Sequence, residues 1–95
     1  MSLNPETTQW AQKIGERIRL QRKAQNLTLD DLSRLSGATV PTLSHIERGT
    51  RDVKLSTLVG LAKALRLQLS DLVATQELEG TLTEITDGYD LDGDA

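Results

Sequence analysis

Apolar residues gather in five stretches of the chain, separated by short polar segments. In the first stretch Ala11, Ile14 and Ile18 are three or four residues apart, which places them on one face of a helix expected over residues 9–25. Four further stretches place apolar side chains inward, at Leu32 and Leu35, at Leu43 and Ile46, at Leu58, Leu61, Ala62 and Leu65, and at Leu72 and Val73. Five short helices joined by brief loops describe a compact all-α domain.

Capping signals divide the second helix from the third. Thr28 followed by Asp31 forms a capping box that starts the second helix, and Gly37 is expected to end it. Thr39 is expected to cap the third helix, and Gly49 to stop it. Two short helices joined by a turn that contains Gly form a helix-turn-helix, whose second helix can enter the major groove of DNA. This feature indicates a DNA-binding module.

Further local signals place the other helix boundaries. Asn26 can close the first helix in a left-handed conformation, Ser56 is expected to cap the fourth, and Ser70–Asp71 to begin the fifth. Arg22 follows Ile18 by one helical turn, so it lies on or beside the apolar face of the first helix. An Arg in that position needs a partner, because an unpaired buried charge is costly.

Charge divides the chain into two parts. Residues 1–76 carry all 11 Lys and Arg and have a net charge of +4, whereas residues 77–95 carry seven acids and no base. A basic domain suits nucleic acid, and acidic tails are commonly interaction or solvating segments. We therefore expect a flexible leader over 1–8, a helix-turn-helix domain over 9–76, and an acidic, largely disordered tail over 77–95.

Composition argues against several classes of protein. The chain has no Cys, one His, no G-x-S-x-G motif and no Gly-rich phosphate loop, so we expect no enzyme, no metal site and no cofactor. Asp90, Asp92 and Asp94 have the spacing that opens a calcium loop, but the following Gly and the distal Glu are missing. No apolar run approaches the ~20 residues that span a bilayer, and the N-terminus lacks a signal-peptide core. We expect a cytoplasmic protein.

Residues 14–73 resemble the Cro-repressor (XRE) helix-turn-helix family. The matching residues are I-G-E-R-I (14–18), Arg22, L-T-L-D-D-L (27–32), Gly37, Thr39, L-S-H-I-E-R-G (43–49) and L-A-K-A-L (61–65). The resemblance covers about two-thirds of the chain, and the combination of these motifs is more specific than any one of them. It implies a five-helix, lambda-repressor-like domain that binds double-stranded DNA in bacterial or phage cytoplasm, in association with the nucleoid.

The resemblance assigns the reading of bases to the third helix, expected over Val40–Arg48. In the family, residues early in this helix meet base edges. Here those positions are Val40, Pro41, Thr42 and His45, with Ser44 alongside. His45 can donate or accept at a purine N7 or O6 according to its tautomer, and Val40 can touch a thymine methyl group. Because Val40 and Pro41 are apolar, specificity is expected to rest on Thr42, His45 and DNA shape. The alternative for His45 is a solvated helix residue.

Other residues are expected to hold the DNA backbone. The phosphate clamps of the family fall on Thr28 and Thr39, whose helix N-termini present N–H groups to an anion. Arg48, Arg51 and Lys54 are the expected charged contacts, and the alternative for these three is a solvated basic loop.

One further pair is structural. The family pairs an Arg of its first helix with the Glu of the E-R-G segment, and these residues are Arg22 and Glu47 here. The resemblance therefore implies an ion pair that fixes the third helix against the first.

The resemblance implies a repressor that binds an operator as a homodimer on two half-sites about 34 Å apart. The dimer contact is expected on the C-terminal face, with exposed apolar residues among Leu67, Leu69, Leu72, Val73 and Leu78. Restriction–modification controllers and small phage regulators share this short build. The run R-D-V-K-L-S-T-L (51–58) favours a HipB-like antitoxin that represses its own operon and binds a kinase-type toxin.

A second class of function stays open. Coactivators with this same domain bridge transcription proteins, so the chain could be a protein-interaction module whose acidic tail binds a basic partner. The tail could also mimic DNA and compete for the basic face.

Overall fold

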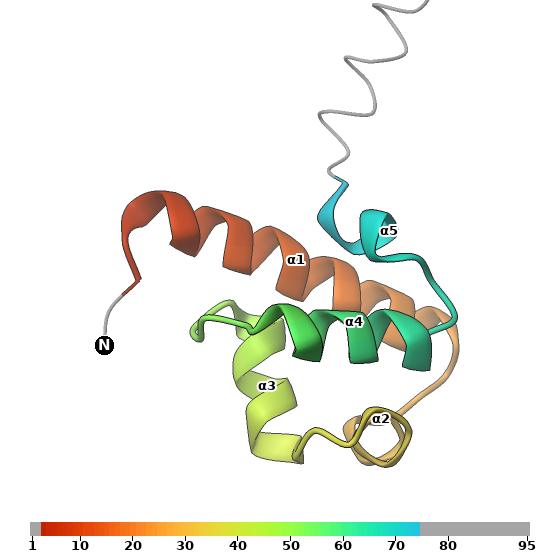
Figure 1. Cartoon of the computed structure of the whole chain (residues 1–95). Helices are drawn as coiled ribbons and strands as arrows, with labels where there is room; N and C mark the ends of the chain where they lie inside the picture. The colour runs from red at the N-terminus through yellow and green to blue at the C-terminus, as the bar shows by residue number, and fades with distance from the viewer. Residues whose placement is uncertain (1–2, 75–95) are drawn as a thin grey trace, which may run out of the picture.

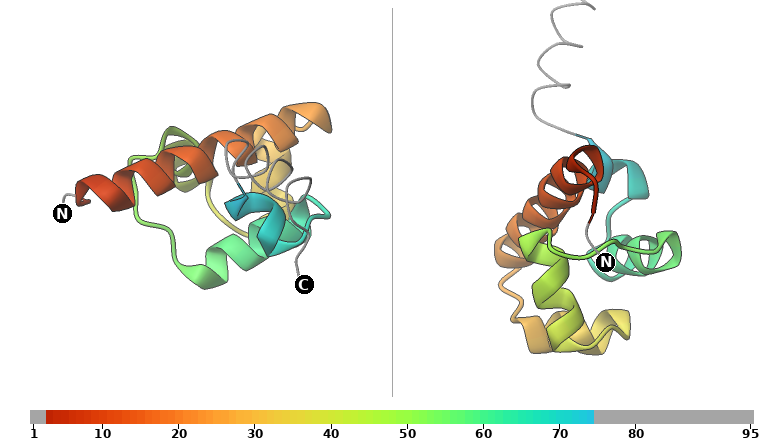
Figure 2. Two further views of the ribbon diagram at one scale, coloured as in Figure 1. Left: turned by 90° about the horizontal axis from the view of Figure 1, so that it is seen from above. Right: turned by 90° about the vertical axis from the view of Figure 1, so that its left-hand side faces the viewer.

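The computed structural model describes residues 3–74, which form five helices. They are α1 (Pro5–Ala24), α2 (Leu29–Ser36), α3 (Val40–Arg48), α4 (Leu55–Ala64) and α5 (Leu69–Val73). In Figure 1, α1 lies across the domain, α4 passes in front of its C-terminal part, and α2 and α3 form the lower edge. Figures 1 and 2 show α3 and α5 against different sides of α1. The predicted all-α domain of five helices is confirmed, and the acidic tail over 77–95 lies outside the described residues.

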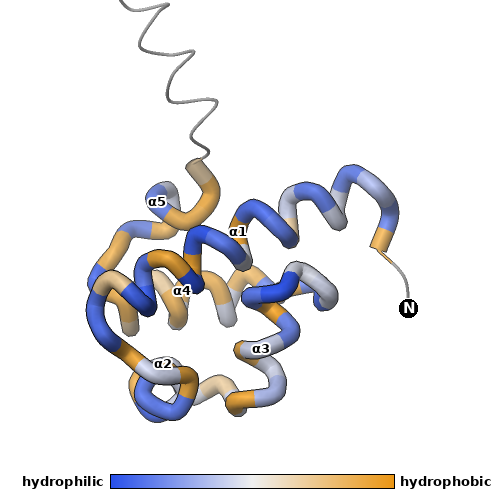
Figure 3. Tube along the Cα trace, turned by 180° about the vertical axis from the view of Figure 1, so that it is seen from behind, coloured by the Kyte–Doolittle hydropathy of each residue, from blue (hydrophilic) through white to orange (hydrophobic). Residues whose placement is uncertain are grey.

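The first helix begins earlier than its apolar periodicity predicts. It starts at Pro5 rather than near Gln9, because Asn4 accepts a hydrogen bond from the Thr7 N–H at 2.7 Å and Pro occupies the first turn. Glu6 adds a favourable negative charge there. The first turns of α1 are mainly hydrophilic in Figure 3, so periodicity gave no signal for them. The expectation of a flexible leader over 1–8 is therefore wrong from Pro5 onward.

The predicted left-handed cap at Asn26 is confirmed, as are the predicted helix ends at Gly37 and Gly49, which are left-handed as well. Asn26, Gly37 and Gly49 have φ angles of 59°, 83° and 71°. Gly37 and Gly49 are the C-caps of α2 and α3, and Asn26 follows Gln25, the C-cap of α1. Such angles strain most side chains but suit Gly and, to a lesser degree, Asn. The turn between α2 and α3 therefore begins with a left-handed residue, and glycine at position 37 adopts this conformation without strain.

Two predicted helix starts are wrong by a residue or two. Lys54, and not Ser56, occupies the N-cap position of α4, and its side chain makes no capping hydrogen bond. Helix α5 starts with a capping box in which the Gln68 N–H donates to the Asp71 carboxylate at 2.8 Å. Ser70 therefore lies inside α5. Helix α4 thus starts without a side-chain cap that the sequence could show, and α5 starts at a Gln that is an uncommon N-cap residue.

The core is aliphatic and draws on all five helices. Its buried residues are Ile18, Leu32, Leu43, Ile46, Leu58, Leu61, Ala62, Leu65 and Leu72. Leu35, expected to be buried, is 58% exposed. Leu29, Leu32 and Ser36 define the inner face of α2, and at about 3.6 residues per turn Leu35 projects roughly a quarter turn to one side.

The predicted dimer face is partly wrong. Leu72 is 1% exposed and belongs to the core, and Leu67 and Leu69 pack against that core. Val73 is 37% exposed, and Leu78 lies outside the described residues. The short helix α5 turns its apolar side inward between α1 and α4, which leaves little of it for a partner.

Candidate nucleic-acid interface

Helices α2 and α3 form the helix-turn-helix, and side-chain caps fix the corner between them. The Ser33 hydroxyl donates to the Ala38 carbonyl at 2.5 Å, which ties the end of α2 to the turn. The Thr39 hydroxyl accepts from the Thr42 N–H at 3.3 Å and contacts the Thr42 hydroxyl at 2.9 Å. The predicted cap at Thr39 is confirmed, and it starts α3 in a fixed direction from α2.

Helix α3 turns Leu43 and Ile46 into the core and presents its polar residues outward. The predicted DNA-contacting residues lie as follows: Thr28 and Thr39 are exposed N-caps, Val40, Thr42, Ser44 and His45 are half-buried on α3, Pro41 and Arg48 are exposed on α3, and Arg51 and Lys54 are exposed after it. The structure thus places most of the predicted residues on or directly after one helix.

Hydrogen bonds connect the side chains on the outer face of α3 with one another and with the loop that follows this helix. Arg48 Nη1 donates to Ser44 Oγ at 2.9 Å, and Arg51 Nη1 lies 3.5 Å from Thr42 Oγ. His45 Nδ1 lies 2.9 Å from the hydroxyl of Thr50. Sequence reasoning missed Thr50, because its role depends on the chain turning back at Gly49. The loop residue Arg51 therefore extends the outer face of α3.

A recess of about 500 Å³ adjoins this face. It is lined by Leu3, Asn4 and Thr7 at the start of α1 and by His45, Thr50, Arg51 and Asp52. The unexpected N-terminal turns of α1 therefore lie beside the end of the recognition helix.

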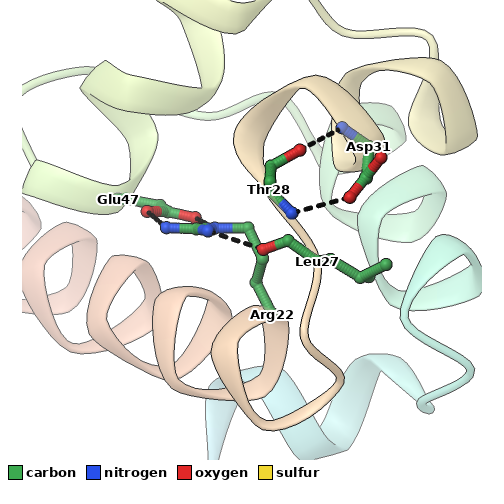
Figure 4. A network of polar contacts seen from close by, with 5 residues as sticks. All are labelled: Arg22, Leu27, Thr28, Asp31 and Glu47. Carbon is green, nitrogen blue, oxygen red and sulfur yellow. Dashed lines mark hydrogen bonds and ion pairs between the residues drawn. The ribbon is translucent and has the colours of Figure 1, made fainter.

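The N-terminus of α2 is occupied by its own capping box. Thr28 Oγ accepts from the Asp31 N–H at 3.0 Å, and the Thr28 N–H donates to the Asp31 carboxylate at 2.9 Å (Figure 4). Leu29 and Asp30 follow the cap, and the N–H groups of a first helical turn have no intrahelical acceptor. An anion at this end would therefore meet those N–H groups, whereas the Thr28 N–H is already bonded.

The Asp31 carboxylate is stabilised in its ionised form. Hydrogen bonds from the backbone and hydroxyl of Thr28, with a smaller effect of Arg34, lower the pKa of Asp31. A carboxylate with a lowered pKa stabilises the folded state at pH above its ordinary pKa, and this contribution is lost as the pH falls through the lowered value.

We therefore expect acid to loosen the start of α2. Amide hydrogen exchange at the N-terminus of α2 should accelerate as the pH falls below the ordinary range of an aspartate, after correction for the intrinsic exchange rate. Asp31→Asn should show faster exchange at neutral pH and no further acceleration in acid. Equal pH dependence in the two proteins would contradict this role.

A buried ion pair fixes the recognition helix to the scaffold. Arg22 Nε donates to Glu47 Oε2 at 2.7 Å and Nη2 donates to Oε1 at 3.1 Å, while Nη1 donates to the Leu27 carbonyl at 2.8 Å (Figure 4). The two charged side chains are only 11% and 6% exposed. The hydrogen bond with Glu47 raises the pKa of Arg22. The predicted pair is confirmed, and it also holds the segment that leads into α2.

Glycine brings α1 directly against the end of α3. A Cβ atom on Gly15 would lie 2.2 Å from the Ile46 carbonyl oxygen and 2.8 Å from that of Glu47. A Cβ atom on Gly49 would lie 2.6 Å from Cα of Gln12. Sequence reasoning gave no role to Gly15, because the sequence alone does not show which distant backbone packs against a glycine inside a helix. The backbones of α1 and α3 therefore touch without side chains between them.

These features define a class of protein. A polar and basic outer face on the second helix of a helix-turn-helix, with a basic loop beside it, is the arrangement with which such proteins enter the DNA major groove. In residues 3–74, no helix is sufficiently long and apolar to traverse a bilayer, and no three potential metal-binding side chains come together.

The chain belongs to the helix-turn-helix family HTH_3, whose profile matches residues 18–72. It is 36% identical to the control protein C.SmaI of Serratia marcescens over 70% of this chain and 79% of that protein. It is 31% identical to the transcriptional repressor RghR of Bacillus subtilis over 84% of this chain and 70% of that one. Several other curated relatives are longer, and the chain spans 38% to 58% of their length.

A solved structure supports the same family. The restriction-modification controller protein C.AhdI from Aeromonas hydrophila is 35% identical and has a TM-score of 0.64, covering 65% of this chain and 94% of that chain. The residues that match the family profile include both helices of the helix-turn-helix.

Proposed function

We propose that this protein is a transcriptional regulator that binds a specific double-stranded DNA operator through α3 and represses transcription there. The observation that carries the proposal is the outer face of α3, where Thr42, Ser44, His45 and Arg48 lie together with Arg51 beside them. Hydrogen-bonding groups on such a helix can reach base edges in the major groove. Selection of bound duplexes from random DNA tests the proposal: a recovered consensus supports it, and an unenriched pool contradicts it.

The interface divides into residues that read bases and residues that hold phosphates. Thr42 and His45 are the proposed polar readers, with Val40 and Pro41 offering apolar contact. The phosphate contacts are assigned to exposed basic side chains and helix N-termini, at Arg48, Arg51, Lys54, Thr28 and Thr39. Phosphate contacts fix the position of the protein on DNA, and base contacts supply the sequence preference.

Arg51→Ala is expected to weaken binding to all duplexes by a similar factor. Each neutralised phosphate contributes ~0.9 to the slope of log affinity against log salt, so the slope should fall by about one. Lys63→Ala is the matched control, since Lys63 is an exposed base in the last turn of α4, away from α3. The measurement is fluorescence anisotropy with one duplex at several salt concentrations. Equal slopes for wild type and Arg51→Ala would remove Arg51 from the interface.

We propose that the protein acts as a homodimer, because a single small domain covers little DNA and paired half-sites give useful affinity. Sedimentation velocity at micromolar concentration tests this: a dimer supports it, and a monomer that also binds DNA singly contradicts it. RghR, a relative named as a repressor, supports repression as the direction of regulation.

A narrower form of the proposal is an antitoxin that represses its own operon. The run over 51–58 supports it. This run lies in the loop after α3 and the first turn of α4, where Leu55 is 65% exposed and Leu58 is buried in the core. Co-purification of a kinase-sized toxin encoded beside this chain would support that form. Full repression by this chain with no such partner would favour a plain repressor.

A further inference from the structure

The one histidine of the chain is held by a threonine that follows α3. His45 Nδ1 lies 2.9 Å from Thr50 Oγ, and the same hydroxyl donates to the His45 carbonyl at 3.2 Å. The Thr50 N–H also donates to that carbonyl at 3.1 Å. Thr50 therefore bonds to both the backbone and the ring of His45, which fixes the ring against the end of α3.

The contacts of the Thr50 hydroxyl bear on which ring nitrogen of His45 carries the proton. A threonine hydroxyl has one hydrogen to donate and also accepts. When this hydrogen goes to the His45 carbonyl, Thr50 Oγ is left as an acceptor, and Nδ1 must supply the hydrogen for the 2.9 Å contact. In neutral imidazole the other nitrogen, Nε2, then carries a lone pair.

The competing contact is longer. Arg48 Nη2 lies 3.5 Å from His45 Nδ1, and a guanidinium can only donate, so it would require a lone pair on Nδ1. That arrangement makes two donors share one lone pair and leaves the 3.2 Å contact without a hydrogen, although the carbonyl still accepts from the N–H groups of Gly49 and Thr50. Arg48 Nη1 already bonds to Ser44 at 2.9 Å. A protonated Nδ1 satisfies the contacts at 2.9 and 3.2 Å, whereas an unprotonated Nδ1 satisfies those at 2.9 and 3.5 Å, so the shorter pair of contacts favours the protonated nitrogen.

We propose that Thr50 is a positioning residue that holds His45 as the Nδ1–H tautomer and so determines which bases His45 accepts. With Nε2 as an acceptor, His45 pairs with an exposed amino donor in the major groove, N4 of cytosine or N6 of adenine. It disfavours guanine, which presents only the acceptors N7 and O6 there. This base preference rests on the proposed function, whereas the tautomer is a property of the free protein.

The tautomer is measurable because the chain has a single histidine. Long-range ¹H–¹⁵N correlation spectra of the full chain, at a pH where the ring is neutral, distinguish the protonated nitrogen from the free one. We expect the Nδ1–H pattern in wild type and in Thr50→Ser, and a shift to the Nε2–H pattern in Thr50→Val. Arg48→Ala should leave the pattern unchanged. An Nε2–H pattern in wild type would overturn the proposal.

Selection from random duplexes tests the consequence. Wild type and Thr50→Ser should enrich cytosine or adenine at the base that depends on His45, identified by its loss of preference in His45→Ala. Thr50→Val should move that position toward guanine by at least several-fold. Guanine in the wild-type consensus overturns the inference while the proposed function stands. No enrichment at any position, with the Nδ1–H pattern intact, contradicts the proposed function and with it the base preference.

Discussion

Gly15→Ala is expected to be among the most damaging single substitutions in this domain. The added Cβ would lie 2.2 Å from the Ile46 carbonyl oxygen, a backbone atom that cannot rotate away. Helix α1 or the end of α3 must therefore shift, and overpacking of this kind costs ~1–3 kcal/mol or more. The free energy of unfolding, measured by urea titration with circular dichroism, should fall by about that amount. DNA affinity should fall as well, because α3 no longer packs against α1 in its original position.

Gly60→Ala is the matched control for this substitution. Gly60 also lies inside a helix, but its added Cβ would come no closer than 3.9 Å to the Ser36 carbonyl oxygen. Alanine there should stabilise the domain by ~0.5–1 kcal/mol, because glycine weakens a helix interior. If both variants gained stability to the same extent, the close approach of α1 and α3 at Gly15 would be wrong.

Arg22→Ala should destabilise the domain by a comparable or larger amount. It leaves the Glu47 carboxylate, 6% exposed, without its partner, and breaking such a buried pair costs ~3–5 kcal/mol. That is a large share of the ~5–15 kcal/mol that stabilises a typical domain. Thermal unfolding should show a clearly lower midpoint than wild type. The substitution also removes the hydrogen bond to the Leu27 carbonyl, so the segment before α2 should loosen.

Two further variants separate the buried charge from simple loss of a side chain. Arg22→Met combined with Glu47→Leu replaces both partners by apolar groups of similar size, and it should recover much of the lost stability. Arg34→Ala removes a base that pairs with Asp31 on the surface, where its side chain is 71% exposed, and it should unfold nearly as wild type does. An Arg22→Ala protein as stable as Arg34→Ala would show that the pair with Glu47 is not buried in solution.

Much of the helix-turn-helix could be predicted because its signals are local. The capping box at Thr28 and the left-handed glycines Gly37 and Gly49 each depend on a few neighbouring residues. Their chemistry is therefore readable in the sequence. The pair of Arg22 with Glu47 joins distant residues, and it was predictable from a family resemblance together with the need of a buried Arg for a partner.

The features that were missed depend on packing between helices. Leu35 and Leu72 are both leucines at plausible inward positions, yet one is exposed and the other buried, since neighbouring helices decide which side is covered. Gly15 matters only because the end of α3 passes over it. Thr50 gains its role from the turn that brings it back to His45. Hydrophobic periodicity describes one helix at a time, so it does not show which neighbouring helices cover a face or which distant residues meet.

Base reading by α3 is tested by comparing His45→Ala with Arg51→Ala on two duplexes, the selected operator and a scrambled sequence of the same length. His45→Ala should lower the ratio of the two affinities by about fivefold, because a good bidentate base contact is worth ~1–3 kcal/mol of discrimination and a single contact falls at the lower end of that range. Arg51→Ala should weaken both complexes and leave the ratio unchanged. An unchanged ratio in His45→Ala, at full affinity for the operator, would contradict sequence reading by His45.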